Sequence, residues 1–235
     1  MSRRYRAVVF DLFGTVVQFR GQPDRTVEWL RAPLAAVQPG LAFDAFRAAL
    51  RDVSTAISAA RAADHREVPS GERFARALAL AGVADAGAAE VLSLAHMAHI
   101  AERTLLPSDH DTLLHQLGGL YRLGLVSNFD HAPTARDVLL RHGVARHFEV
   151  TLISDSFGRR KPHPAIFAAA LQQLDVPPSQ AIYVGDTHAD DVVGARGAGM
   201  DVAWIANPHD ADLEPRPTHR IRQLADLRTL LGAVD

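Results

Sequence analysis

Residues 8–15 read Val8-Val9-Phe10-Asp11-Leu12-Phe13-Gly14-Thr15, and this stretch decides how the rest of the chain is interpreted. The apolar, β-branched run over residues 7–10 is typical of a short strand that is buried on both faces. A carboxylate, Asp11, follows at once, and Gly14 and Thr15 mark a loop. The pattern predicts a buried strand that presents an acid at the edge of a sheet. An aspartate that only caps a turn gives the same pattern, so the interpretation depends on the other strands.

Four further apolar runs resemble this strand, and helical stretches separate the later ones. The runs cover residues 125–126, 150–153, 181–184 and 202–205. Helices are predicted near 109–122, 132–143, 163–174 and 189–198, with a closing helix over 224–232. Strands that alternate with helices at this spacing predict an α/β fold, a doubly wound parallel sheet of the Rossmann type with helices on both faces.

Polar residues follow each of the predicted strands directly. They are Asp11, Ser127-Asn128, Ser154-Asp155, Gly185-Asp186 and Asn207. In open parallel sheets, ligands bind beyond the carboxyl ends of the strands. We therefore expect these side chains to converge at one edge of the sheet, which a single polar residue after one strand would not indicate.

The segment from residue 19 to residue 104 has a different character. It is rich in alanine and arginine and has no strand-like run. Apolar residues from Phe43 to Ile57 recur at intervals of three and four, which predicts a helix with one buried face. Ser70 is a predicted N-cap of the next helix. We interpret 19–104 as an all-helical insert and the Pro-rich residues 207–217 as a surface loop.

The composition excludes several classes of protein. The 235 residues carry 25 basic and 27 acidic side chains, a net charge of −2, so no basic field for nucleic acid is present. The absence of cysteine excludes disulfides, thiolate metal sites and a cysteine nucleophile. No apolar run approaches the roughly 20 residues that a membrane span needs, and no secretory segment is evident. We expect a cytoplasmic monomer or homodimer that binds neither nucleic acid nor membrane.

Four motifs with chemical potential occur in order along the chain. They are Asp11 with its loop, Ser127-Asn128, Lys161-Pro162, and Gly185-Asp186 followed by Asp190-Asp191. Lys161 is the only lysine beside 24 arginines, which indicates a position that needs a compact ammonium group. In this order the motifs resemble the haloacid dehalogenase superfamily of hydrolases over nearly the whole chain. The resemblance implies a core of residues 1–18 and 105–235, and a helical C1-type cap of residues 19–104 between the first and second motifs.

The resemblance also implies the roles of individual residues. The catalytic set is Asp11, Thr15, Ser127, Asn128 and Lys161, with Asp11 as the nucleophile, and the ligands of a Mg²⁺ ion are Asp11, the backbone carbonyl of Phe13, Asp186 and Asp191. Electrostatics supports a cation at this place, because each contact of a phosphate with a carboxylate at ~4 Å costs roughly 4 kcal/mol at an effective dielectric near 20. Magnesium prefers carboxylates, carbonyls and phosphate oxygens. We expect a magnesium-dependent phosphatase that acts on a small phosphorylated metabolite through an aspartyl-phosphate.

Phe13 departs from the pattern of the family's phosphatases, which carry an acid two residues after the nucleophile. The 2-haloacid dehalogenases of the family usually have an aromatic residue there, because a halide leaves without a proton. Asp186 argues for the metal-dependent hydrolases, since dehalogenases use no metal, and Phe167 stands where dehalogenases have a tyrosine. The phosphatase is the first hypothesis, a 2-haloacid dehalogenase-like hydrolase is the alternative, and a catalytically weak binding protein of this fold is a third.

A last group of residues has two interpretations each. Gly14, Arg66, Glu72, Arg73 and His188 are candidate substrate contacts, and His188 is also a candidate replacement for the missing acid. A solvated loop would explain the charged residues equally well, and for His188 a solvent-exposed loop position is the better explanation. His96 and His99 are spaced as a metal pair would be on a helix, but no third ligand is evident, so a role within the insert is the better explanation.

Overall fold

The computed structural model describes residues 4–21, 26–207, 210 and 213–232. Its centre is a six-stranded sheet in the order β5-β4-β1-β6-β7-β8, and every neighbouring pair is parallel. The strands are β1 (Ala7–Phe10), β4 (Arg122–Ser127), β5 (Val150–Ile153), β6 (Ala181–Gly185), β7 (Asp201–Ile205) and β8 (His219–Ile221). Phe10 pairs with Leu125 on one side and with Val184 on the other, so β1 lies in the middle of the sheet.

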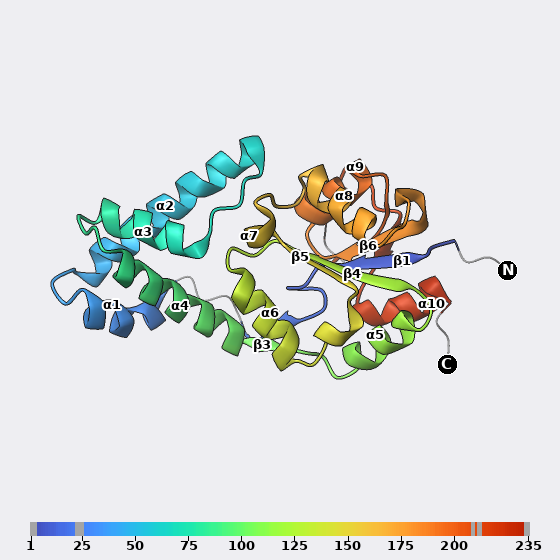
Figure 1. Ribbon diagram of the computed structural model, residues 1–235, viewed down its shortest axis with the longest axis horizontal. Coiled ribbons are helices and arrows are strands. Elements are labelled where there is room, and N and C mark those ends of the chain that lie inside the picture. The colour runs from blue at the N-terminus through green and yellow to red at the C-terminus, as the bar shows by residue number, and fades with distance from the viewer. Residues whose placement is uncertain (1–3, 22–25, 208–209, 211–212, 233–235) are drawn as a thin grey trace.

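Helices cover both faces of the sheet (Figure 1). One face carries α5 (His110–Gly118), α6 (Ala132–Arg141) and α10 (Leu227–Leu231), and the other carries α8 (Pro164–Gln173) and α9 (Val193–Gly197). The side chains of Val8 and Phe10 pack in the first of these layers, whereas Ala7 and Val9 pack in the second. Successive side chains of β1 therefore point into two different apolar cores, one on each face of the sheet, as expected for a doubly wound sheet.

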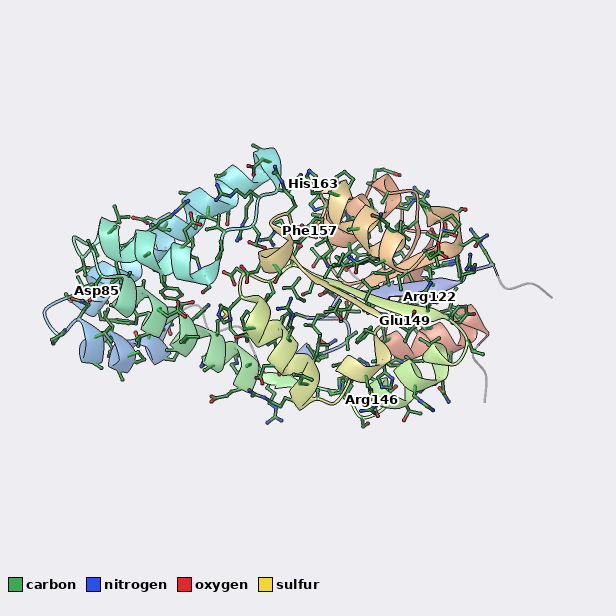
Figure 2. The ribbon with its side chains drawn as sticks, in the orientation of Figure 1. Asp85, Arg122, Arg146, Glu149, Phe157 and His163 are labelled. Carbon is green, nitrogen blue, oxygen red and sulfur yellow. The ribbon has the colours of Figure 1, made fainter. Side chains whose placement is uncertain are left out.

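In the described part of the chain, the short helix η1 (Glu28–Leu30) and four α-helices lie between β2 and β3 and form the insert, which extends from one end of the sheet (Figure 1). The α-helices are α1 (Arg31–Val37), α2 (Phe43–Asp64), α3 (Ser70–Leu80) and α4 (Ala86–Glu102). The predicted face of α2 is buried, with Phe46 packed against Phe74 of α3 in a separate apolar cluster. At the distal end Asp85 caps α4, because its Oδ1 accepts a hydrogen bond from the backbone N–H of Ala88 at 2.9 Å (Figure 2). We refer to residues 28–102 as the helical insert.

Short elements complete the chain. A two-stranded antiparallel ribbon of β2 (Gln18–Phe19) and β3 (Thr104–Leu105) joins the insert to the core, and it escaped the sequence analysis because two-residue strands carry no periodicity. The remaining elements are η2 (Ala145–His147), η3 (Pro178–Gln180), η4 (His188–Val192, a π-helical turn), η5 (Leu224–Asp226) and α7 (Ser154–Phe157). None of the described helices is both long and apolar enough to cross a membrane.

Two local predictions were wrong, and one strand was missed. The helix predicted over 109–122 ends at Gly118, because the chain enters β4 at Arg122, whose guanidinium pairs with Glu149 at 2.8 Å (Figure 2). Ser70 is not an N-cap: Pro69 holds that position and Ser70 is the buried first residue of α3. Strand β8 was missed because it holds a single apolar residue, Ile221. The predicted loop 207–217 lies partly outside the described residues.

Candidate active site

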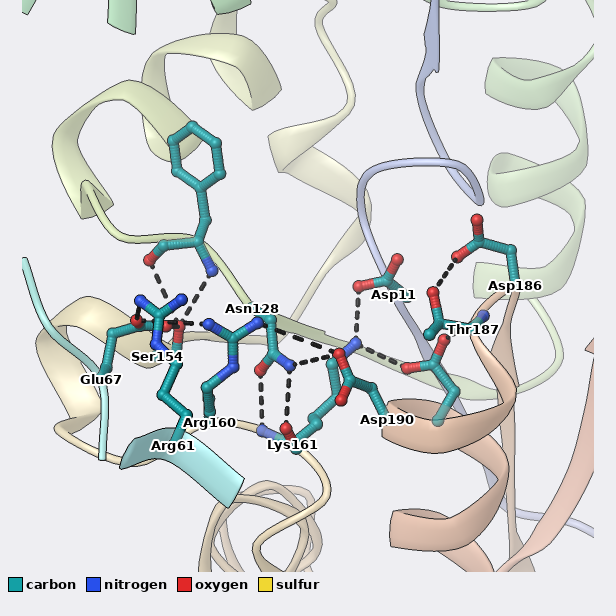
Figure 3. A network of polar contacts seen from close by, with 12 residues as sticks. Asp11, Arg61, Glu67, Asn128, Ser154, Arg160, Lys161, Asp186, Thr187 and Asp190 are labelled. Atoms are coloured by element: carbon teal, nitrogen blue, oxygen red, sulfur yellow. Dashed lines mark hydrogen bonds and ion pairs between the residues drawn. The ribbon is translucent and has the colours of Figure 1, made fainter. Parts of the chain in front are cut away.

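Lys161 lies at the centre of a buried polar cluster at the carboxyl edge of the sheet. Its side chain is only 2% exposed. The ammonium Nζ donates to Asp11 Oδ1 at 2.6 Å, to Asp191 Oδ1 at 2.7 Å and to the hydroxyl of Tyr183 at 2.8 Å. Figure 3 shows the contact between Lys161 and Asp11. The three acceptors satisfy the three N–H groups of an ammonium, so the lysine is fully engaged.

The charges of this cluster perturb one another strongly. Burial raises the pKa of Asp11 to about 7, against the opposing effect of Lys161 and with a further rise from Asp191 and Asp186. Burial also raises the pKa of Asp186 to about 6. Burial lowers the pKa of Lys161, but Asp11 and Asp191 outweigh it and hold that pKa above its usual value. One ammonium group therefore faces three carboxyl groups, and the acidic groups of the site outnumber the basic one.

The three carboxylates are placed so that they could hold a metal ion. One oxygen from each of Asp11, Asp186 and Asp191 lies within 4.8 Å of the others. Gly14 lets its loop close on Asp186, because a Cβ at this position would lie 2.2 Å from Asp186 Oδ2, and its φ of +88° suits glycine. Oxygen ligands of this kind fit a hard divalent cation such as magnesium. The backbone carbonyl of Phe13 stays a prediction as a ligand.

Asp191 and Asp190 differ in what they contact. Asp191 is buried, binds Lys161 through Oδ1 and accepts the backbone N–H of Thr187 through Oδ2 at 2.9 Å. Asp190 lies outside the three-carboxylate cluster and accepts from Asn128 Nδ2 at 3.0 Å. Asn128 in turn holds the backbone of Lys161, accepting its N–H at 2.7 Å and donating to its carbonyl at 3.0 Å. Asn128 and Asp190 thus fix the loop that carries the lysine.

Two hydroxyl groups of the predicted site have no partner. Thr15 and Ser127 are buried, and neither side-chain oxygen makes a hydrogen bond within the described structure. Buried polar groups without partners are rare in folded proteins and call for an explanation. Thr15 and Asp186 both line a polar pocket of about 450 Å³. A role of these two hydroxyls as hydrogen-bond donors to a ligand stays a prediction.

Tyr183 is a site residue that the sequence analysis missed. Its hydroxyl accepts from Lys161 and donates to the carbonyl of Val126 at 3.1 Å, while its ring packs edge-on against Phe167 with 5.3 Å between centroids. Burial raises its pKa well above the usual value, so the phenol stays protonated. The only signal in the sequence was a hydroxyl-bearing residue inside an otherwise apolar strand.

Aromatic rings surround the position where an acid was expected. Phe13 stacks on Phe19 with 5.5 Å between centroids and lies 4.7 Å from the ring of Phe129. Phe19 is 44% exposed, and the other two are half-buried. The surface that these three rings form is therefore apolar and offers no proton.

The remaining candidates lie elsewhere or make other contacts. Arg66 is exposed, Glu72 pairs with Arg76, and Arg73 pairs with Asp130 of the core at 3.2 Å. The ring of His188 packs against Trp204, and its Nε2 lies 3.1 Å from the carbonyl oxygen of Pro215. These contacts explain Glu72, Arg73 and His188 without a ligand, and the roles of all four residues toward substrate stay predictions.

His96 and His99 stack on Trp29 inside the insert, with ring centroids 5.7 and 3.8 Å from it. The metal cluster found among the described residues does not include them. This arrangement agrees with a packing role within the insert.

Comparisons with known proteins agree on one family. The model of the haloacid dehalogenase-like hydrolases matches residues 5–199. "Haloacid dehalogenase-like hydrolase domain-containing protein 3" of Bos taurus is 36% identical over 117 residues, 48% of this chain and 45% of that protein. A glyceraldehyde 3-phosphate phosphatase of Methanopyrus kandleri is 38% identical over 96 residues, 41% of each chain. The matched part thus spans less than half the length of these relatives.

The fold also matches solved structures over its whole length. A 2-haloacid dehalogenase from Pseudomonas syringae superposes with a TM-score of 0.76 and 24% identity, covering 97% of this chain and 98% of that one. At this identity the match establishes the fold alone. The predicted family and the predicted α/β fold are confirmed.

Proposed function

The chain belongs to the haloacid dehalogenase-like hydrolases, and we propose that it is a magnesium-dependent phosphatase that acts on a small phosphorylated metabolite through an aspartyl-phosphate on Asp11. The observation that carries the proposal is the cluster of Asp11, Asp186 and Asp191 around a single ammonium group. These three carboxylates, of which Asp11 and Asp191 are buried, outnumber Lys161, and a divalent cation would balance them. The phosphatase named among the similar proteins supports the same class of substrate.

Asp11 and Lys161 supply the covalent chemistry. Lys161 binds Asp11 Oδ1, which leaves Oδ2 as the oxygen that attacks phosphorus. The new bond joins Oδ2 to phosphorus as the bond from phosphorus to the leaving oxygen breaks. Water then cleaves the acyl phosphate, releases inorganic phosphate and restores the carboxylate. Asp11, Asp186 and Asp191 would hold Mg²⁺, which when bound neutralises the approaching phosphate.

The other groups bind and orient the phosphoryl group. The orphaned hydroxyls of Ser127 and Thr15 are available to donate to its oxygens. Lys161 holds positive charge beside the reacting carboxylate, and Asn128 keeps the lysine loop in place. The helical insert would act as a cap that excludes bulk water when it closes over the substrate.

Phe13 narrows the choice of substrate. General acid catalysis is typically worth roughly 10²- to 10⁴-fold in rate, and Phe13 cannot provide it. Phosphates whose leaving group departs as a stable anion are least affected, such as acyl phosphates, aryl phosphates and sugar 1-phosphates. The wall of Phe13, Phe19 and Phe129 suits an apolar or aromatic leaving group.

The same aromatic wall favours a second candidate, a 2-haloacid dehalogenase-like activity. In that reaction Asp11 Oδ2 attacks carbon and displaces halide, and no proton is needed. Asp186 is the observation against it, since a third carboxylate beside the nucleophile repels both a carboxylate substrate and a departing halide.

A panel assay tests the proposal. Phosphate release is measured from p-nitrophenyl phosphate, acyl phosphates and alkyl phosphates, with Mg²⁺ and with EDTA, for the wild type and for Asp11→Asn. The proposal predicts release that needs Mg²⁺ and is lost in Asp11→Asn. Halide release from 2-haloacids in EDTA, without phosphate release, would favour the dehalogenase. If neither phosphate nor halide is released, the remaining hypothesis is a catalytically weak binding protein of this fold.

A further inference from the structure

Glu67 is a buried carboxylate of the helical insert that contacts the core. Its side chain is 0% exposed. Oε2 accepts from the hydroxyl of Ser154 at 2.6 Å, and Oε1 pairs with Arg61 of the insert and with Arg160 of the core, the latter at 3.4 Å. A carboxylate is almost never buried to this degree unless it is paired, and here the two arginines come from opposite sides of the boundary.

Backbone hydrogen bonds hold the segment around Glu67 against the core. Its own N–H donates to the carbonyl of Gly158 at 3.1 Å, and the N–H of Arg160 donates to the carbonyl of His65 at 2.9 Å. The N–H of Ser70 donates to the carbonyl of Asp130 at 2.7 Å. Residues 65–70 are therefore docked on the two loops that follow β4 and β5, and Glu67 is the buried charge at this junction.

A continuous series of contacts leads from Glu67 to the catalytic lysine (Figure 3). Arg160 directly precedes Lys161, and its Nη2 lies 4.0 Å from Asp190 Oδ2. Asp190 accepts from Asn128, and Asn128 binds the backbone N–H and carbonyl of Lys161. Ser154, the other partner of Glu67, accepts the N–H of Phe129 at 2.9 Å, one residue after Asn128. Through Oε1 and Arg160, and through Oε2 and Ser154, the Glu67 carboxylate thus contacts the two loops that position Lys161.

We propose that Glu67 is a positioning residue, through which docking of the helical insert sets the alignment of Lys161 with Asp11. This inference rests on the proposed function. Among the described residues, Arg160 has two acidic partners, Glu67 and Asp190. When the insert moves away, Asp190 is the partner that remains, and a closer Arg160–Asp190 pair competes with the bond from Asn128. The lysine is then held correctly only while the insert is docked.

Glu67→Gln is the first test, because it keeps an acceptor for Ser154 and removes the charge that binds Arg160. We expect kcat for p-nitrophenyl phosphate to fall at least tenfold while KM changes less than twofold, since Glu67 acts on Lys161 and not on the substrate. Glu28→Gln is the matched control: Glu28 also lies in the insert and pairs with arginines, Arg31 at 2.9 Å and Arg47 at 3.7 Å, but its side chain is 45% exposed. A kcat within twofold of wild type for Glu67→Gln would overturn the proposal.

A double-mutant cycle with Arg160→Gln separates positioning from general damage to the fold. If Glu67 acts through Arg160, the kcat of the double variant equals that of the less active single variant. Independent effects that multiply would contradict the inference. If Glu67→Gln does not fold, Arg160→Gln alone removes the same ion pair and should lower kcat in the same way.

Hydrogen–deuterium exchange gives a readout that does not depend on the proposed activity. The backbone N–H of Lys161 donates to Asn128 Oδ1, so it reports directly on the lysine loop. In Glu67→Gln we expect faster exchange in the peptide that contains residues 159–163, and unchanged exchange in Glu28→Gln. Equal exchange in wild type and Glu67→Gln would refute the positioning role. A wild type without Mg²⁺-dependent phosphate release would refute the proposed function and leave this exchange test intact.

Discussion

Replacing Lys161 by methionine removes the ammonium group from the buried cluster and leaves its carboxylates facing one another. The two ion pairs, at 2.6 and 2.7 Å, each represent an attraction of about 6 kcal/mol at an effective dielectric near 20. Desolvation of the charges offsets most of this attraction, and removing one partner of a buried pair typically costs about 3–5 kcal/mol. We therefore expect Lys161→Met to lower the free energy of unfolding at pH 7.5 by about 3–5 kcal/mol.

The pH dependence of this loss follows from Asp11. Its pKa is already raised to about 7, first by burial, and removal of Lys161 takes away the main opposing influence. A carboxylate with a raised pKa in the folded state destabilises the fold increasingly as pH rises from about 4 toward that pKa. At pH 5 the carboxylate binds a proton in the variant, so the loss should fall by about half relative to pH 7.5.

Urea unfolding at pH 5 and pH 7.5, followed by tryptophan fluorescence, measures both effects. The double variant Lys161→Met/Asp11→Asn is the control, because it removes one of the unpaired charges and should regain part of the lost stability at pH 7.5. A loss below about 1 kcal/mol, an equal loss at the two pH values, or no recovery in the double variant would refute the electrostatic account.

Three further substitutions test other parts of the structure. Phe13→Asp places an acid beside the nucleophile and should raise kcat/KM for alkyl phosphates at least about tenfold relative to p-nitrophenyl phosphate; an unchanged ratio would contradict the role given to Phe13. Tyr183→Phe removes one of the three acceptors of Lys161 and should lower kcat about tenfold. Tyr121→Phe is the control: the hydroxyl of Tyr121 donates to the distant carbonyl of Leu231, so its removal should leave kcat unchanged. Equal effects of the two substitutions would contradict a specific role of Tyr183. Burial, with a contribution from a neighbouring arginine, lowers the pKa of His96 to about 3, so the fold excludes the proton that the unfolded chain binds below about pH 6.5. Wild type should therefore lose about 2 kcal/mol more stability than His96→Gln between pH 7 and pH 5 in urea titrations, and parallel pH profiles would contradict this.

The sequence predicted the parts of the site that local patterns determine. Asp11, Ser127 and Asp186 each follow or end a buried strand, so the topology of a parallel sheet brings them to one edge. Lys161 stood out as the only lysine in the chain. In these cases the position in a strand–loop junction carries the information, and the structure brings Lys161, Asp11 and Asp186 together as expected.

The contacts that hold this site in place were not predictable in the same way. Tyr183 reads as a core residue of β6, because its hydroxyl finds Lys161 only after two distant segments meet. Glu67 directly follows the exposed Arg66 in sequence and gives no periodic signal, yet it is buried at the junction with Arg160. The wrong N-cap at Ser70 has the same origin, since docking of its N–H on Asp130 determines where α3 begins. Long-range contacts of this kind override local preferences.

The most direct test of the account is to trap the covalent intermediate on Asp11. Wild-type protein is mixed with p-nitrophenyl phosphate and Mg²⁺, quenched in acid within the first turnover, digested and analysed by mass spectrometry. The account predicts one phosphoryl group on the peptide that contains Asp11, present with Mg²⁺ and lost in EDTA and in Asp11→Asn. Phosphate release without phosphorylation of this peptide, or an ester of Asp11 with a 2-haloacid in place of the phosphoryl group, would contradict it.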